Sequence, residues 1–143
     1  MVTVDKKQLG DGSLHVTIAG KIDEKFDAHV DGPGKVVVHL GGVRSISSLG
    51  VRAFESFVAH LANHEVELIH VSPAIASQMA MIPNLCPNAK VLSAKLPFTC
   101  RACGNEKNHS VPWQVNACVE HAPTCDCGAP MELDGLPEQY LPS

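Results

Sequence analysis

Cysteine and serine are the side chains whose spacing suggests chemistry in this sequence of 143 residues. Five of the six cysteines lie between positions 100 and 127, and only Cys86 lies outside that segment. Three serines, Ser45, Ser47 and Ser48, lie close together in an earlier part of the chain. Clustered cysteines in a reducing compartment indicate metal binding rather than disulfides. Serines that precede a helix can accept hydrogen bonds from its free N–H groups.

The cysteine segment contains two short knuckles that predict a zinc ribbon. The first is Cys100-x-x-Cys103 and the second is Cys125-x-Cys127, and a glycine follows each of them. The spacer between Cys103 and Cys125 is 21 residues long, which suits a ribbon. Four thiolates around Zn²⁺ leave no open coordination position, so we expect a structural rather than a catalytic metal. The predicted ligands are Cys100, Cys103, Cys125 and Cys127.

The second knuckle leaves the identity of one ligand open. It is one residue shorter than the usual Cys-x-x-Cys, and Cys118 and His121 lie just before it. Either of these would replace Cys125 if the short turn cannot place both of its sulfurs on one metal ion.

The serines lie at the junction between a predicted strand and a predicted helix. Residues 35–40 contain the Val-rich pattern VVVHL, which is typical of a buried strand. After the junction, apolar residues recur at the helical spacing i, i+3, i+4 and i+7, beginning at Phe54. We therefore expect a helix over 48–63. Ser48 is either only its N-cap or a hydroxyl at which a phosphate would be stabilised by the helix N–H groups and dipole.

The remaining patterns predict an α/β fold for residues 1–94. Strands are expected at 14–19, 35–40, 66–71 and 90–93, with a short partner strand at 1–4. Helices are expected at 48–63 and 73–81, with a short one at 23–30. Alternation of strands and helices favours helices packed on a sheet, with parallel strands on either side of the 48–63 helix.

The composition of the sequence changes at Lys95. Residues 95–143 are rich in Cys, Pro, Gly and Asn and have little apolar periodicity. A segment of that length with few large side chains is not expected to build a core of its own, so a metal ion would have to stabilise it. We therefore predict two units, a main domain at 1–94 and a zinc-ribbon extension at 95–143.

Charge and hydropathy exclude several classes of protein. The net charge is −4, and the extension carries more acidic than basic residues, which disfavours nucleic-acid binding. No apolar run approaches the roughly 20 residues that span a bilayer. The first residues lack the basic-then-apolar order of a signal peptide. A cytoplasmic protein without a membrane span is therefore expected.

Three segments of the main domain resemble the STAS domain of bacterial anti-sigma factor antagonists. That family has a Gly-x-hydrophobic-Asp motif, a Val-rich strand and a serine-containing junction that opens a helix. The matching segments are GKID at 20–23, VVVHL at 36–40 and ISSLGVR at 46–52. The resemblance covers about residues 1–94 and implies a mixed β-sheet with helices mainly on one face.

The resemblance also implies a regulatory site. In the family, the first serine of the junction is phosphorylated by a partner kinase that is also an anti-sigma factor, and this position falls on Ser48. The family's acidic residues at the strand end and before that serine are replaced here by His39 and Ser47, whereas Asp23 is kept. The expected partner contacts are Asp23, Ser47, Ser48 and Arg52.

Two functions follow from this resemblance. The first is a non-enzymatic bacterial regulatory module that docks a serine kinase, an anti-sigma factor or a signalling complex and is switched by phosphorylation of Ser48. The second is a constitutive scaffold or adaptor subunit of a signalling or transport complex without such a switch. A serine hydrolase is disfavoured because the sequence has no Gly-x-Ser-x-Gly elbow. The partner, the pathway and the oligomeric state stay open.

Overall fold

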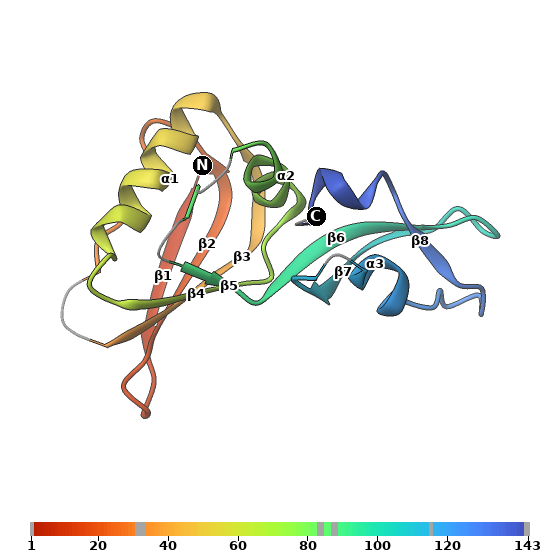
Figure 1. The fold of residues 1–143 in the computed structure, drawn as a ribbon, viewed down its shortest axis with the longest axis horizontal. Helices are drawn as coiled ribbons and strands as arrows, with labels where there is room; N and C mark the ends of the chain where they lie inside the picture. Colours follow the sequence, from red (N-terminus) through yellow and green to blue (C-terminus); the bar gives the residue numbers. More distant parts are fainter. Residues whose placement is uncertain (1, 31–33, 83–84, 87–88, 115, 142–143) are drawn as a thin grey trace.

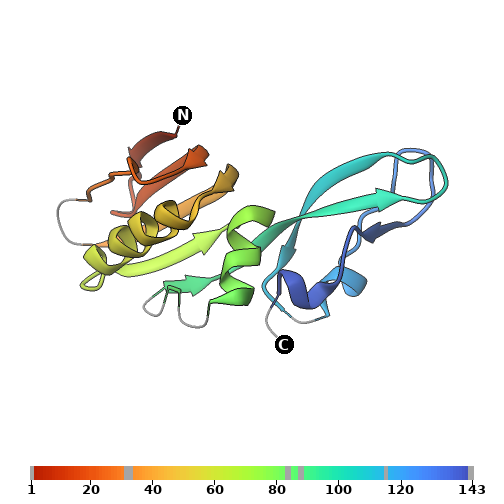
Figure 2. The same ribbon diagram turned by 90° about the horizontal axis from the view of Figure 1, so that it is seen from above.

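The chain forms two β-sheets that follow one another along the molecule (Figure 1). This computed structural model describes residues 2–30, 34–82, 85–86, 89–114 and 116–141. Figure 2 shows the two sheets joined where a helix of the first sheet meets the start of a strand of the second. Mixed α/β architecture, as expected from the sequence, is therefore confirmed.

The first sheet is mixed and has its strands in sequence order. The strands are β1 (Thr3–Gln8), β2 (Leu14–Ile22), β3 (Lys35–Ile46), β4 (Glu65–Ile69) and β5 (Ala89–Val91). β1 pairs antiparallel with β2, and every later neighbour pairs parallel. The parallel pairing of β3 with β4, on either side of the first helix, confirms the prediction from the strand–helix alternation.

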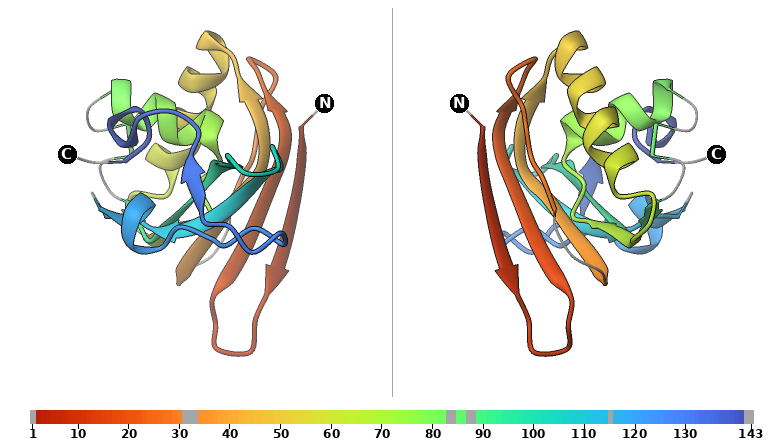
Figure 3. Two further views of the ribbon diagram at one scale, coloured as in Figure 1. Left: turned by 90° about the vertical axis from the view of Figure 1, so that its right-hand side faces the viewer. Right: turned by 90° about the vertical axis from the view of Figure 1, so that its left-hand side faces the viewer.

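Helices α1 (Ser48–His60) and α2 (Pro73–Met81) cover one face of the first sheet (Figure 3). The reason is visible in the sequence, because alternate residues of β2 and β3 are apolar and a helical stripe of α1 is apolar too. Val16 and Val38 of the sheet are fully buried, as is Phe54 of α1. Ser72 caps α2 by accepting from the N–H of Ile75, with proline at the first helical position, as predicted.

Two local predictions in this part were wrong. Strand β3 does not end at Leu40 but continues to Ile46, because Gly42 lets it approach β2 closely where β3 itself bulges by one extra residue. A Cβ at Gly42 would lie 2.8 Å from the Cβ of Ala19. The short helix expected at 23–30 is a turn followed by irregular chain. Its apolar residue, Phe26, is buried against the aromatic rings of α1 instead.

The second sheet is antiparallel and three-stranded, with the order β7–β6–β8. Its elements are β6 (Ser93–Cys100), β7 (Glu106–Pro112), helix α3 (Ala117–Glu120), β8 (Met131–Leu133) and the short 3₁₀ helix η1 (Pro137–Gln139). Strand β6 begins beside the first sheet, where the N–H of Lys95 donates to the carbonyl of Val71 at 2.7 Å. The boundary that was predicted between residues 94 and 95 therefore falls inside β6. The division of the chain into two units stays a prediction.

The extension contributes more to the core than the sequence suggested. Leu96 and Phe98 of β6 are fully buried, and Val111 and Met131 are nearly so. They belong to one apolar cluster that continues from the first sheet. The apolar residues of this segment are few, but those of β6 alternate along the strand and face inward, so the segment shares the core of the first sheet and does not form a separate one.

Candidate functional site

The first turn of α1 forms an exposed corner at the end of β3. Ser47 caps the helix, because its Oγ accepts from the N–H of Gly50 at 3.0 Å. Ser48 is the first helical residue and is exposed. The N-cap interpretation of Ser48 was therefore wrong by one residue, and its hydroxyl is not used in capping the helix.

The end of β2 fixes the position of this corner. The N–H of Ser47 donates to the carbonyl of Ile22 at 3.0 Å. A Cβ on Gly50 would lie 2.3 Å from the same carbonyl oxygen and 3.1 Å from the Cα of Asp23. Only glycine fits between the helix and the strand end, so the motif GKID and the serine junction meet in space.

The corner brings together the four residues that were expected to contact a partner. Asp23 lies under the helix start, where its Oδ1 accepts from the N–H of Lys25 at 2.9 Å and so closes the loop. Arg52 is exposed and lies one helical turn after Ser48, on the same side of α1. The first turn carries no acidic side chain. Its free N–H groups and the helix dipole therefore favour an anion here.

Leu49 also belongs to this corner, although it was not in the predicted set. Its side chain is 54% exposed, between Ser48 and the buried Gly50. Its place on the helix, opposite the apolar stripe that begins at Phe54, is the signal that could have identified it. By contrast, His39 does not lie at the corner. It alternates with Val38 and Leu40 and therefore lies on the other face of the sheet.

The other candidate site is a group of four thiols at the far end of the second sheet. The sulfur atoms of Cys100, Cys103, Cys125 and Cys127 all lie within 4.8 Å of one another. The Cys100–Cys127 and Cys103–Cys125 sulfur pairs are each 3.5 Å apart. Sulfurs bound tetrahedrally at about 2.3 Å from Zn²⁺ lie roughly 3.8 Å from each other, so the group fits this ion.

Both knuckles close in the same way despite their different lengths. The N–H of Gly104 donates to the carbonyl of Cys100, and the N–H of Gly128 donates to the carbonyl of Cys125, each at 2.8 Å. These glycines have φ values of +79° and +92°, which disfavour other residues. The short second knuckle therefore brings both of its sulfurs into the group.

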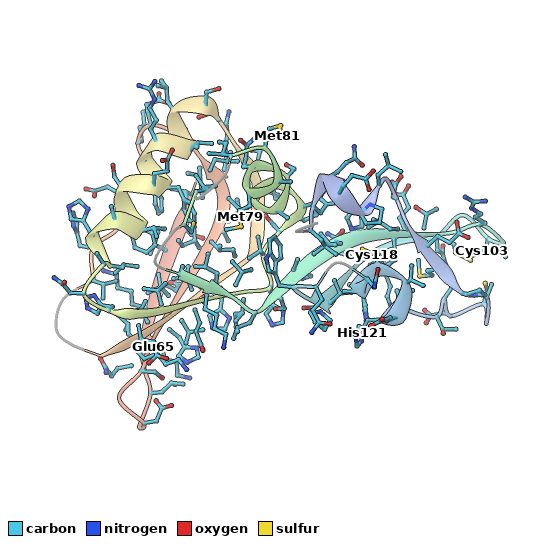
Figure 4. The ribbon with its side chains drawn as sticks, in the orientation of Figure 1. Glu65, Met79, Met81, Cys103, Cys118 and His121 are labelled. Carbon is cyan, nitrogen blue, oxygen red and sulfur yellow. The ribbon has the colours of Figure 1, made fainter. Side chains whose placement is uncertain are left out.

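The alternative ligands lie elsewhere. Cys118 is buried in α3, and His121 is exposed at the end of that helix. Neither belongs to the four-thiol group, and Figure 4 shows both away from Cys103.

The thiols of the group share protons in the absence of a metal ion. The N–H of Cys127 and the neighbouring thiols lower the pKa of Cys125 to about 6. The N–H of Asn105 acts to lower the pKa of Cys103, but donation to Cys125 and contacts with the other thiols outweigh it and raise this pKa to about 12. Binding of a divalent ion would displace the shared protons.

Comparison with known proteins bears on the first site. The family model described as STAS domain matches residues 11–82, which extend from the hairpin before β2 to the end of α2. The match includes the whole corner and stops before the four thiols. A search of curated proteins finds no match to the chain. Among the described residues, every helix is too short or too polar to cross a membrane.

Proposed function

Because this chain belongs to the STAS domain family, we propose that the α1 corner docks a protein partner in the manner of an anti-sigma factor antagonist. STAS domains are in general binding modules rather than catalysts, and they occur in anti-sigma factor antagonists and with sulfate transporters. In this proposal the contact surface is formed by Asp23, Ser47, Ser48, Leu49 and Arg52.

The observation that carries the proposal is the exposed hydroxyl of Ser48 at the first helical position, free of the capping role. A kinase can reach such a group without unfolding the helix. Leu49 beside it supplies an exposed apolar contact of the kind that a partner would cover. Phosphorylation of Ser48 would therefore place its charge next to the apolar contact.

A phosphate at this position would change the docking surface strongly. It adds nearly two negative charges, which the helix N–H groups stabilise on the protein itself. Arg52, one turn later, can pair with the same phosphate, as basic residues at i+4 do. The phosphate on Ser48 and Arg52 would then interact with each other rather than with a partner. A partner that contacts either group at this corner would therefore dissociate.

For the extension, we propose that Cys100, Cys103, Cys125 and Cys127 hold one structural Zn²⁺. The spacing of their sulfurs supports this, and a closed tetrahedral set of four thiolates suits a structural Zn²⁺. Free thiols are kept in a reducing compartment, so a cytoplasmic location in a bacterium belongs to the same proposal. The ion would make residues 95–143 a ribbon attached to the STAS domain.

The experiment is affinity capture from the native cell with the wild-type chain as bait, followed by calorimetric titration of the partner so identified. Ser48→Ala and Ser48→Asp are compared with Ser56→Asp, which puts the same charge on an exposed serine further along α1. We expect Ser48→Asp to weaken binding at least tenfold and Ser56→Asp to leave it unchanged. Mass spectrometry of the chain from the same cell should find phosphate on Ser48.

The adaptor function predicts a different result. If the partner binds Ser48→Asp and wild type equally and Ser48 carries no phosphate in the cell, the switch is wrong and a constitutive adaptor remains. The replacement of the family's acidic residues by Ser47 and His39 favours that second function. If Leu49→Lys also leaves the affinity unchanged, the corner is not the docking surface.

A further inference from the structure

A single asparagine contacts three of the four cysteines of the proposed metal site. Asn105 lies between Gly104 and the start of β7. Its carbonyl accepts from the N–H of Cys100 at 2.8 Å, and its own N–H faces the sulfur of Cys103. Its side chain reaches across to the second knuckle, where Nδ2 donates to the sulfur of Cys125 at 3.7 Å. The side chain of Asn105 therefore joins the first knuckle to a sulfur of the second.

The second knuckle has few backbone donors for this sulfur. N–H groups within a knuckle can point at the sulfur of its first cysteine, and only Asp126 lies between Cys125 and Cys127. The N–H of Cys127 acts on the sulfur of Cys125. In a Cys-x-x-Cys knuckle, one further residue would bring one further N–H. The side-chain amide of Asn105 supplies a hydrogen bond that the shorter knuckle does not provide.

The chemistry of the sulfur determines which end of the amide faces it. A thiolate bound to a metal ion accepts hydrogen bonds and donates none, so the NH₂ group of Asn105 faces Cys125 and the carbonyl oxygen faces away. Hydrogen bonds to a charged acceptor are stronger than those between neutral groups. We therefore expect the contact to strengthen when an ion is bound.

The surroundings of the Cys125 sulfur increase the effect of such a donor. A recess of about 130 Å³ beside Cys125 is also lined by Asn105, Glu106, Lys107 and Asp126. Four thiolates and one Zn²⁺ carry more negative than positive charge, and two of these lining side chains are acidic. The amide of Asn105 directs the positive end of its dipole at the sulfur, which offsets part of this negative charge.

We propose that Asn105 is a positioning residue of the metal site, whose side-chain amide orients the sulfur of Cys125 and stabilises its thiolate when Zn²⁺ is bound. This inference rests on the zinc site proposed above. Contacts of this kind behind the ligands orient them, and their loss weakens metal binding by about 10–100-fold. Because the backbone of Asn105 also closes the first knuckle, this one residue links the two halves of the site.

The experiment compares Asn105→Ala and Asn105→Asp with the same two substitutions at Asn108, an exposed asparagine of β7 outside the four-thiol group. Both changes at position 105 keep the backbone contacts and remove the donor, and an ionised Asp also adds a negative charge. Asn105 is exposed, so neither change removes packing from the core. The zinc dissociation constant of each full-length chain is measured by competition with a chelating dye. Each chain is then saturated with Co²⁺, whose thiolate-to-metal absorption band reports the electron density on the sulfurs.

We expect the zinc dissociation constant to rise about tenfold for Asn105→Ala and further for Asn105→Asp, and to stay unchanged in the Asn108 variants. The Co²⁺ band should move to longer wavelength in both Asn105 variants, because a thiolate that has lost a hydrogen bond gives up its electrons more easily.

Two results would overturn the role of Asn105 while leaving the zinc site in place. In the first, wild type holds one Zn²⁺ and the Asn105 variants match the Asn108 variants. In the second, the Asn105 variants bind zinc more weakly but the Co²⁺ band of the saturated site does not move, which indicates a purely structural contribution. A wild-type chain that binds no zinc would overturn the zinc site and the role of Asn105 together.

Discussion

The α1 corner and the four-thiol group are both tight turns that require glycine, but different forces hold them. At the corner, Gly50 is buried against a strand carbonyl, and the turn is fixed by the core beneath it. At the thiols, Gly104 and Gly128 are exposed and only turn the backbone. The corner is therefore organised by packing, whereas a metal ion is expected to organise the thiols. The proposed docking surface and the proposed metal site are thus held by different means, and this contrast can be tested.

Removal of the metal should have the largest effect and should be confined to one sheet. A structural Zn²⁺ contributes on the order of 10 kcal/mol or more to folding of small zinc units. After treatment with a strong chelator we expect hydrogen exchange in β6–β8 to accelerate by several orders of magnitude, while β2 and β3 stay protected. Equal loss of protection from hydrogen exchange in both sheets would contradict a metal effect that is confined to the second sheet.

Cys103→Ser tests the proposed zinc site without a chelator. Its side chain is exposed, so its replacement removes a ligand and little packing. The zinc content should fall well below one ion per chain. The matched control is Cys118→Ala, which removes a thiol outside the group and should retain one Zn²⁺.

Gly50→Ala should have the second largest effect, now in the first sheet. The added methyl group would meet the carbonyl oxygen of Ile22 at 2.3 Å, a contact that backbone atoms cannot easily relieve. Overpacking of this kind costs about 1–3 kcal/mol, and we expect the upper end of that range in urea unfolding. Gly10→Ala is the control, since nothing lies within 4 Å of its added Cβ. A cost below that of the control would mean that the corner is not held by packing.

The sequence predicted the fold where periodicity was strong and local. The apolar alternation of β2 and β3 and the stripe of α1 determined the layers, and the Ser72-Pro73 pair determined the start of α2. It could not predict that β3 continues through Gly41-Gly42, because that depends on how a bulged β3 pairs with β2. Nor could it predict how the first helical turn packs on the end of β2, which decides whether Ser47 or Ser48 is the cap.

In the candidate sites, too, local features were predictable and long-range contacts were not. The spacing of the cysteines predicted the four thiols that come together, but it left Cys125 open against Cys118 and His121, because the reach of a short knuckle depends on its backbone. The contact between His15 and His39 was not predictable, because they are 24 positions apart and meet only through the register of two parallel strands. Long-range register is information that a single sequence does not carry.

Ser47→Ala tests the cap assignment and should cost less than Gly50→Ala. Loss of a serine N-cap destabilises a helix by about 1 kcal/mol, because one N–H of the first turn loses its acceptor. Ser48→Ala should change the free energy of unfolding by less than about 0.5 kcal/mol, since its exposed side chain does not cap the helix. If the two variants are equally destabilised in urea, Ser48 also contributes to the cap and its hydroxyl is not free for modification.

The smallest expected effect is a pH dependence that belongs to the first sheet. Burial, followed by repulsion from His15 and His70, lowers the pKa of His39 below 6.5 in the folded state, and the recess beside it also contains Asp5. The unfolded chain therefore binds more protons between the folded pKa and 6.5, so the free energy of unfolding is highest above 6.5 and falls as the pH drops below it.

His39→Gln should reduce that fall, and His60→Gln should not. Urea unfolding of the three chains at about pH 7 and about pH 5.5 measures the difference. Acid also strips metal from thiolates, but that loss is common to the three chains and cancels in the comparison. If His39→Gln and wild type lose equal stability between these two pH values, His39 is not the source of the acid sensitivity, and other groups must account for it.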